Sequence, residues 1–190
     1  PPPLPYPTLF RSVICRQRLR DQFMQDWQSN IDKMSDSIFY RHVKTTFEYS
    51  EYLDIIDIDN YRISFIRFIS QNHSLPIVSG RFTRKPLKDR ICESCNVLGD
   101  EYLFILTCNN VNHKVLRKKY IPKQFYSRPS MFKLIQLFTH SNRHVVHNLA
   151  IYIHKGLLFV IMFCYLYFHM YCTYNCIAHR LLAYCLINYY

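Results

Sequence analysis

The sequence RICESCNVLGDEYLFILTCNNVNH spans residues 90–113 and holds the most informative pattern in the chain. Cys92 and Cys95 are separated by two residues, a spacing that places both sulfurs on one side of a tight turn. Such a pair usually forms half of a tetrahedral zinc site, and a third thiol, Cys108, follows after twelve residues. We therefore predict a zinc-knuckle-like turn at about residues 90–113, with Zn²⁺ as its cofactor.

A tetrahedral zinc site requires a fourth ligand. His113 lies four residues beyond Cys108 and completes the pattern Cys-x2-Cys-x12-Cys-x4-His, in which imidazole and thiolate are both good zinc ligands. His73 is a more distant alternative. The competing interpretation is that the three cysteines are inert buried thiols, since free cysteine is among the most buried residue types. A disulfide framework is disfavoured because the eight cysteines are unevenly spaced and no secretion signal is recognisable.

Charge divides the 190-residue chain, whose length favours a single domain. The chain has 24 basic and 13 acidic residues, and residues 156–190 contain a single charged side chain, Arg180. We predict three parts: a proline-rich linker or stub at residues 1–7, a basic helical domain at 8–155 and a hydrophobic tail at 156–190. The proline-rich start favours polyproline II, so we expect no helix there.

Apolar residues recur at helical spacing in most of the basic domain. The periodicity predicts helices over Thr8–Trp27, 35–47 and 61–69, and a helical hairpin over 130–140 and 143–154. The expected fold is mainly α, a small helical array with one zinc-knuckle-like turn and a hydrophobic C-terminal helix.

Basic side chains cluster in three runs that offer contacts to nucleic-acid phosphates. An alternative is that they form an ordinary solvated surface over an apolar core. The candidate nucleic-acid-binding residues are Arg16, Arg18, Arg20, Arg81, Arg84, Lys85, Arg117, Lys118 and Lys119.

No catalytic motif is recognisable. The chain has three glycines, and it lacks the glycine-rich loops, the Gly-x-Ser-x-Gly elbow and the His-Glu-x-x-His motif of common enzymes. We therefore expect no enzymatic activity and no small-molecule substrate.

The order of several motifs resembles the C-terminal region of non-LTR (LINE-type) retrotransposon endonuclease/reverse transcriptase proteins of invertebrates. The similarity extends over about residues 19–155. It is carried by NHSLPIVSGRF at 72–82, by Arg90-x-Cys92-x2-Cys95, by Gly99-Asp100-Glu101-Tyr102 with the later Cys108, and by the basic residues 117–119.

This resemblance implies a non-catalytic fragment that helps to hold template RNA or target DNA, in the nucleus or the cytoplasm. The Tyr-x-Asp-Asp polymerase signature is absent, so polymerase activity would belong to the parent polyprotein. Two positions depart from the family pattern. Leu103 stands where the family usually has a histidine ligand, so His113 would have to substitute, and Val78 stands where the family tends to have glutamate. Both departures are consistent with a decayed copy.

The tail allows two interpretations. Residues 157–172 carry no charge, and the 17 residues from Gly156 to Cys172 are at the lower limit for crossing a bilayer. They suit a short membrane span or an interfacial helix, which would make the chain a small membrane-anchored protein with a basic cytoplasmic domain. Alternatively, residues 156–190 are translated sequence beyond the natural end of the element.

Overall fold

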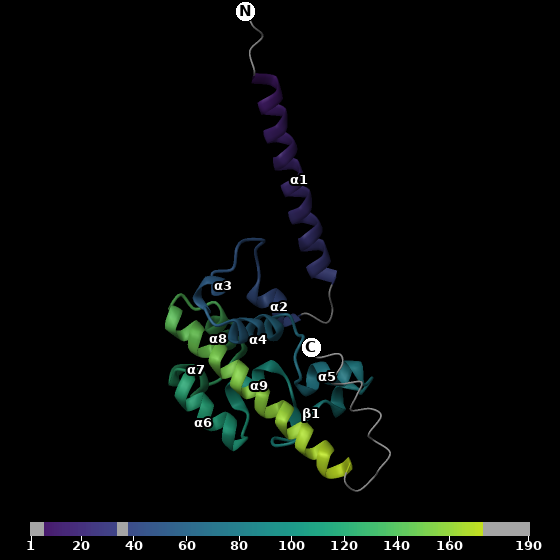
Figure 1. Ribbon diagram of the computed structural model, residues 1–190, viewed down its shortest axis with the longest axis vertical. Coiled ribbons are helices and arrows are strands. Elements are labelled where there is room, and N and C mark those ends of the chain that lie inside the picture. Colours follow the sequence, from purple (N-terminus) through teal and green to yellow (C-terminus); the bar gives the residue numbers. More distant parts are fainter. Residues whose placement is uncertain (1–5, 34–37, 173–190) are drawn as a thin grey trace, which may run out of the picture.

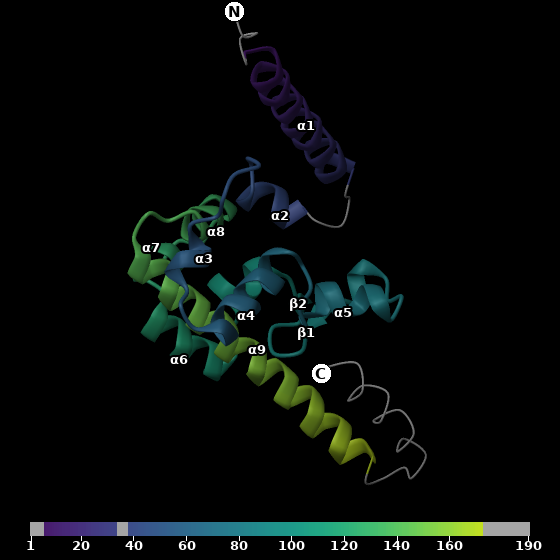
Figure 2. The ribbon, with the colours of Figure 1, turned by 45° about the horizontal axis from the view of Figure 1, so that its top comes forward.

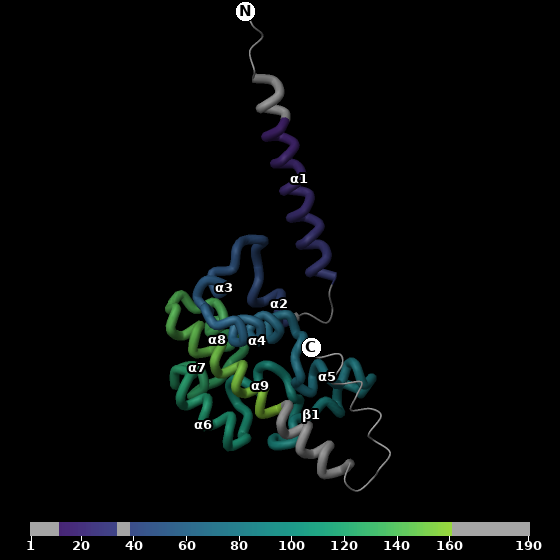
Figure 3. Tube along the Cα trace, viewed as in Figure 1, coloured from purple at the N-terminus to yellow at the C-terminus, as the bar shows by residue number. Residues whose placement is uncertain are grey.

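The computed structural model describes residues 6–33 and 38–172, with side chains over 12–33 and 39–160 (Figure 3). The prediction of a mainly helical fold is confirmed. The elements are α1 (Tyr6–Lys33), α2 (Ile38–Val43), α3 (Tyr52–Ile55), α4 (Asp59–Ile69), α5 (Pro76–Phe82), η1 (Leu87–Asp89), β1 (Ile91–Cys92), β2 (Val97–Leu98), η2 (Leu103–Thr107), α6 (Val111–Tyr120), α7 (Lys123–Tyr126), α8 (Met131–Phe138) and α9 (Arg143–Cys172).

Helix α1 projects away from the other elements (Figure 1). It begins at Tyr6, so the predicted linker is wrong for its last two residues, while residues 1–5 lie outside the described part. A proline at position 7 is compatible with a helix start because the first N–H groups have no intrahelical partner. The C-terminal half of α1 packs against a loop of the helical array. There the rings of Phe23 and Trp27 lie 5.2 and 5.5 Å from the ring of Phe47.

Helix α9 crosses the molecule and packs against α3, α4, α6 and α8 (Figure 1). It joins the predicted helix at 143–154 to the hydrophobic segment 157–172 without interruption, so the backbone has no break at the expected domain boundary. The predicted tail beyond residue 172 lies outside the described residues. Within those residues, no helix combines the length and the apolar character that crossing a membrane requires.

A group of phenylalanine rings forms the centre of the core. Phe68 stacks on Phe138 at 5.9 Å between centroids, and Phe39 meets Phe138 edge to face at 5.0 Å. Phe104 joins the group at 5.6 Å from Phe68. Because Phe104 belongs to η2, the same rings that stabilise the helical array also anchor the segment that leads to Cys108.

Gly156 lets α9 approach η2 closely. A Cβ atom at this position would lie 2.7 Å from Cζ of Phe104 and 3.4 Å from Cε1 of His113. Real Cβ contacts of 2.7 Å do not occur, so glycine is required here by packing rather than by backbone conformation. The glycine therefore sets how closely α9 packs against Phe104 of η2.

We predict that Gly156→Ala destabilises the protein by up to about 2 kcal/mol, because overpacking costs about 1–3 kcal/mol and the helix-propensity gain is about 1 kcal/mol. Urea unfolding of the full chain measures the change. Leu158→Ala, at an exposed position of the same helix, is the matched control and should change the stability by less than about 0.5 kcal/mol. A stabilised Gly156→Ala variant would contradict the close approach.

Candidate metal centre

Strands β1 and β2 form a two-stranded hairpin (Figure 2). It carries Cys92 in β1 and Cys95 in the turn between the strands. Strands β1 and β2 are antiparallel, with Ile91 opposite Leu98 and Cys92 opposite Val97. In the turn, the carbonyl of Cys92 accepts hydrogen bonds from the N–H groups of Cys95, at 3.1 Å, and Asn96, at 2.7 Å. Asn96 adopts φ 55°, a left-handed conformation that asparagine tolerates better than most residues. The turn thereby folds Cys95 back beside Cys92.

The short π-helix η2 brings the third cysteine to this hairpin. Asp100 lies just before it, and its Oδ1 accepts the N–H of Leu103, the first residue of η2, at 2.8 Å. Its end is tightened by a hydrogen bond of 2.7 Å from the N–H of Cys108 to the carbonyl of Leu103. Single π turns occur frequently at functional sites. Here the π turn places Cys108 opposite the turn of the hairpin.

The sulfurs of Cys92, Cys95 and Cys108 all lie within 4.8 Å of one another, so these three residues could hold a metal ion. The Sγ atoms of Cys95 and Cys108 are 3.7 Å apart. Sulfurs that bind one tetrahedral zinc ion at about 2.3 Å are separated by about 3.8 Å. The predicted convergence of the three thiols is therefore confirmed, and their spacing fits a metal of this size.

Two asparagines fasten the cysteine turn to the start of α6. The N–H of Asn109 donates to Sγ of Cys95 at 3.1 Å, and Nδ2 of Asn110 donates to Oγ of Ser94 at 3.1 Å. Asn110 also caps α6, where its Oδ1 accepts the N–H of Asn112 at 3.0 Å. These contacts hold the hairpin against the chain that follows Cys108.

The three thiols differ in acidity. Burial raises the pKa of Cys92 and raises that of Cys108 to about 12. Burial acts in the same sense on Cys95, but hydrogen bonds donated to its sulfur, first by the N–H of Asn109, leave its pKa lowered. Because metals bind thiolates, loading the site must release protons, and metal affinity should fall in acid.

The structure leaves His113, the predicted fourth ligand, outside the group of three sulfurs. Its ring is buried on α6 and packs edge to face on Phe104 at 4.9 Å, near Tyr152. Burial, and then the charge of Arg117, lowers the pKa of His113 to about 4, so the ring is neutral at pH 7. Within the described part of the chain, its Nδ1 has no hydrogen-bond partner.

The alternative ligand, His73, is also absent from the group. Its Nε2 lies 3.1 Å from a carboxylate oxygen of Glu101, and its ring stacks on Phe68 at 4.9 Å. The two positions that depart from the family pattern are both buried, Leu103 in η2 and Val78 in α5. Leu103 lines the same cavity as Cys92 and Cys108.

Arg117 is not a nucleic-acid-binding residue, contrary to the prediction, because it is buried with 5% of its surface exposed. Its guanidinium donates three hydrogen bonds to backbone carbonyls, from Nε to Ile105 at 2.6 Å, from Nη1 to Cys108 at 3.1 Å and from Nη2 to Phe104 at 3.3 Å. The carbonyl of Phe104 also accepts the hydroxyl of Tyr152, whereas Arg117 is the side chain that bonds those of Ile105 and Cys108 at the end of η2. Arg117 therefore positions the backbone of Cys108.

The other eight predicted basic residues reach solvent. Arg81 is half-buried, and its Nη2 lies 3.5 Å from the amide oxygen of Gln71. The remaining seven are exposed: Arg16, Arg18 and Arg20 on α1, Arg84 and Lys85 after α5, and Lys118 and Lys119 on α6. The structure thus leaves them accessible, but it does not gather them around the metal centre.

Sequence reasoning missed the residues that position the thiols. Asn110 carries a recognisable helix-start signal, since asparagine is a favoured N-cap. Tyr152, whose hydroxyl donates to the carbonyl of Phe104 at 2.6 Å, lies far along the chain in a segment that offered no such signal. Arg117 shares a helix face with His113 four residues earlier, which indicates that both point inward together.

Comparison with protein-family models, with curated proteins and with solved structures finds no match for this chain. Its site must be understood from its own geometry.

We predict that Arg117→Ala lowers the free energy of unfolding by about 2–4 kcal/mol, because three buried carbonyls lose their charged donor. Chemical denaturation of the full chain measures the loss. Lys118→Ala replaces the adjacent exposed cation and should alter the stability by less than about 0.5 kcal/mol. Equal effects of the two substitutions would show that Arg117 does not hold the end of η2.

Proposed function

We propose that this chain is a non-catalytic C-terminal fragment of a non-LTR retrotransposon reverse transcriptase that acts as a zinc-knuckle-like module binding RNA or DNA. The observation that carries the proposal is the convergence of three cysteine sulfurs from a hairpin and a π turn. A chain segment built in this way has the donor atoms of a metal-stabilised module. The motif order described above suggests the origin of the module.

Zinc is the metal that the donor set favours. Thiolates are soft ligands that select zinc over the oxygen-preferring magnesium and calcium ions. Cys92, Cys95 and Cys108 would hold the ion, which would link the hairpin to the end of η2. Its contribution would be structural, because a bound ion of this type adds directly to folding free energy.

Exposed arginines on α1 support the nucleic-acid part of the proposal. Arg16, Arg18 and Arg20 are exposed, and no carboxylate in the described part of the chain pairs with them. Their charges are thus available to phosphates, which dominate the affinity of proteins for nucleic acids. A projecting helix gives a long partner access to these side chains from several sides.

Tyr120 on α6 offers a second point of contact. Lys119 and Lys155 lie 5.4 and 5.3 Å from the centre of its ring, and Nζ of Lys155 donates to its hydroxyl at 3.0 Å. A half-buried aromatic ring flanked by two cations combines stacking with phosphate neutralisation. This combination is typical of surfaces that bind single-stranded nucleic acid.

We predict that the full chain binds one zinc ion and that Cys92→Ser removes most of it. Elemental analysis of the purified protein after dialysis measures zinc per chain. Cys15→Ser is the matched control, because Cys15 is an exposed thiol on α1 outside the cluster. Retention of zinc by Cys92→Ser, or its loss from Cys15→Ser, would contradict binding by the three thiols.

We also predict that single-stranded RNA or DNA binds the chain, with an affinity that falls as salt rises. Replacing Arg16, Arg18 and Arg20 by glutamine should weaken binding on the order of 10- to 50-fold at physiological salt and reduce the salt slope by about 2. A mobility-shift titration at several salt concentrations measures both quantities. Alanine at Gln17, Gln22 and Gln25 is the control on the same helix and should have little effect.

The mobility-shift experiment also distinguishes nucleic-acid binding from the alternative of a membrane-anchored protein. Absence of binding at low salt, together with flotation of the chain on anionic liposomes, would contradict the nucleic-acid proposal and favour a basic face that meets lipid.

A further inference from the structure

The three-thiol cluster lacks a fourth ligand from the described part of the chain. In those residues, no histidine, aspartate, glutamate or further cysteine atom joins the three sulfurs. Zinc in proteins is almost always four-coordinate. An ion held by Cys92, Cys95 and Cys108 would therefore retain one position that these residues do not fill.

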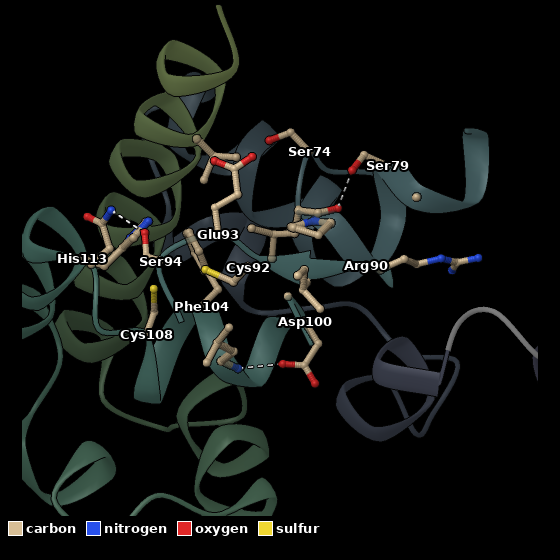
Figure 4. Close-up of a pocket in the computed structure, with 18 of the residues that line it drawn as sticks. Ser74, Ser79, Arg90, Cys92, Glu93, Ser94, Asp100, Phe104, Cys108 and His113 are labelled. Carbon is tan, nitrogen blue, oxygen red and sulfur yellow. Dashed lines mark hydrogen bonds between the residues drawn. The ribbon is translucent and has the colours of Figure 1, made fainter. Parts of the chain in front are cut away.

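A cavity of about 420 Å³ adjoins the cluster, and both Cys92 and Cys108 line it. In Figure 4 the two cysteines and His113 lie at one end of this cavity, with Ser79 and Arg90 at the other. Its volume admits a small organic molecule as well as water. A donor that is not part of the chain can therefore approach Cys92 and Cys108 from this cavity.

The walls of the cavity are partly apolar. Apolar side chains of Leu103, Phe104, Phe159 and Val160 line it. His113 and Ser74 also line the cavity, and each has a buried polar atom, Nδ1 and Oγ respectively, that finds no hydrogen-bond partner among the described residues. Only 6% of the surface of His113 is exposed. Apolar walls with a few unpaired polar atoms are typical of a small-ligand pocket.

The charge balance of the site favours a neutral donor. Three thiolates on Zn²⁺ carry one net negative charge, and the buried Arg117, bonded to the carbonyl of Cys108, offsets it. The charged side chains that line the cavity comprise two cations and three carboxylates: Lys85, Arg90, Asp89, Glu93 and Asp100. An anionic fourth ligand would add an uncompensated negative charge to this partly buried site, which is costly.

Building on the metal binding proposed above, we infer that the fourth coordination position opens into this cavity and accepts an exchangeable neutral nitrogen donor, an aromatic heterocycle of the imidazole class. Water fills the position when no such donor is present. His113 does not take this role, because its ring is held by Phe104 and by the close approach of Gly156. The centre is thus a ligand-accepting site as well as a structural one.

Cobalt(II) substitution of the full chain tests this inference, because cobalt absorption in the visible range reports its ligands. We expect one cobalt ion per chain and thiolate charge-transfer bands in the near ultraviolet. Imidazole should shift the visible bands in a saturable manner with one imidazole per cobalt. Acetate at the same concentration and pH should leave the bands unchanged, which tests the preference for a neutral donor.

His113→Gln separates an external donor from a donor within the chain. We expect the cobalt protein of this variant to respond to imidazole as the unmodified protein does. If imidazole shifts the cobalt spectrum of His113→Gln but not that of the unmodified protein, then His113 is the fourth ligand and the inference is overturned. A cobalt spectrum of the unmodified protein that imidazole leaves unchanged would overturn it without any variant. Failure to bind cobalt at all would instead contradict the proposed metal binding, so the two failures differ.

Discussion

The guanidinium of Arg117 is the interaction on which the candidate site depends. A buried arginine without a carboxylate partner is costly unless its donors are satisfied, and here three carbonyls of the η2 region satisfy them. The same bonds complete the end of a short π-helix, whose carbonyls have no helical partners. Because one of these carbonyls belongs to Cys108, the position of the third thiol follows from the position of α6. The hydroxyl of Tyr152 donates to the carbonyl of Phe104, which Arg117 also bonds, so α9 is connected to the same segment.

The metal centre combines local and long-range constraints. The turn that pairs Cys92 with Cys95 is local, and its hydrogen bonds lie within five residues. Cys108 reaches the turn because Asp100 starts a helical segment and Arg117 ends it. If this centre holds zinc, the positive charge of Arg117 also balances the thiolates, so one side chain would serve both the backbone and the ion.

Sequence reasoning succeeded where the signal was local. The Cys-x2-Cys spacing and the twelve residues between Cys95 and Cys108 are sufficient to predict that three thiols converge. Helical periodicity is sufficient to predict a mainly α fold. It failed for His113 and Arg117, because the basic and apolar residues of α6 do not separate cleanly onto two faces. Proximity along the chain favours His113 as a ligand, whereas tertiary packing turns its ring toward Phe104.

The helix bounds show the same limitation of sequence patterns. Pro7 was expected to prevent a helix, but a proline is tolerated in the first turn, where α1 begins. The hydrophobic residues after Gly156 suggested a separate tail because their composition changes there. Composition, however, does not interrupt backbone hydrogen bonding, and α9 continues through the glycine, which packing against Phe104 requires.

X-ray absorption spectroscopy at the zinc edge of the loaded full chain tests the central claim most directly, because it counts the atoms bound to the metal. The account predicts three sulfurs at about 2.3 Å and one nitrogen or oxygen at about 2.0–2.1 Å. Two sulfurs or fewer, or four, would contradict a centre made by Cys92, Cys95 and Cys108.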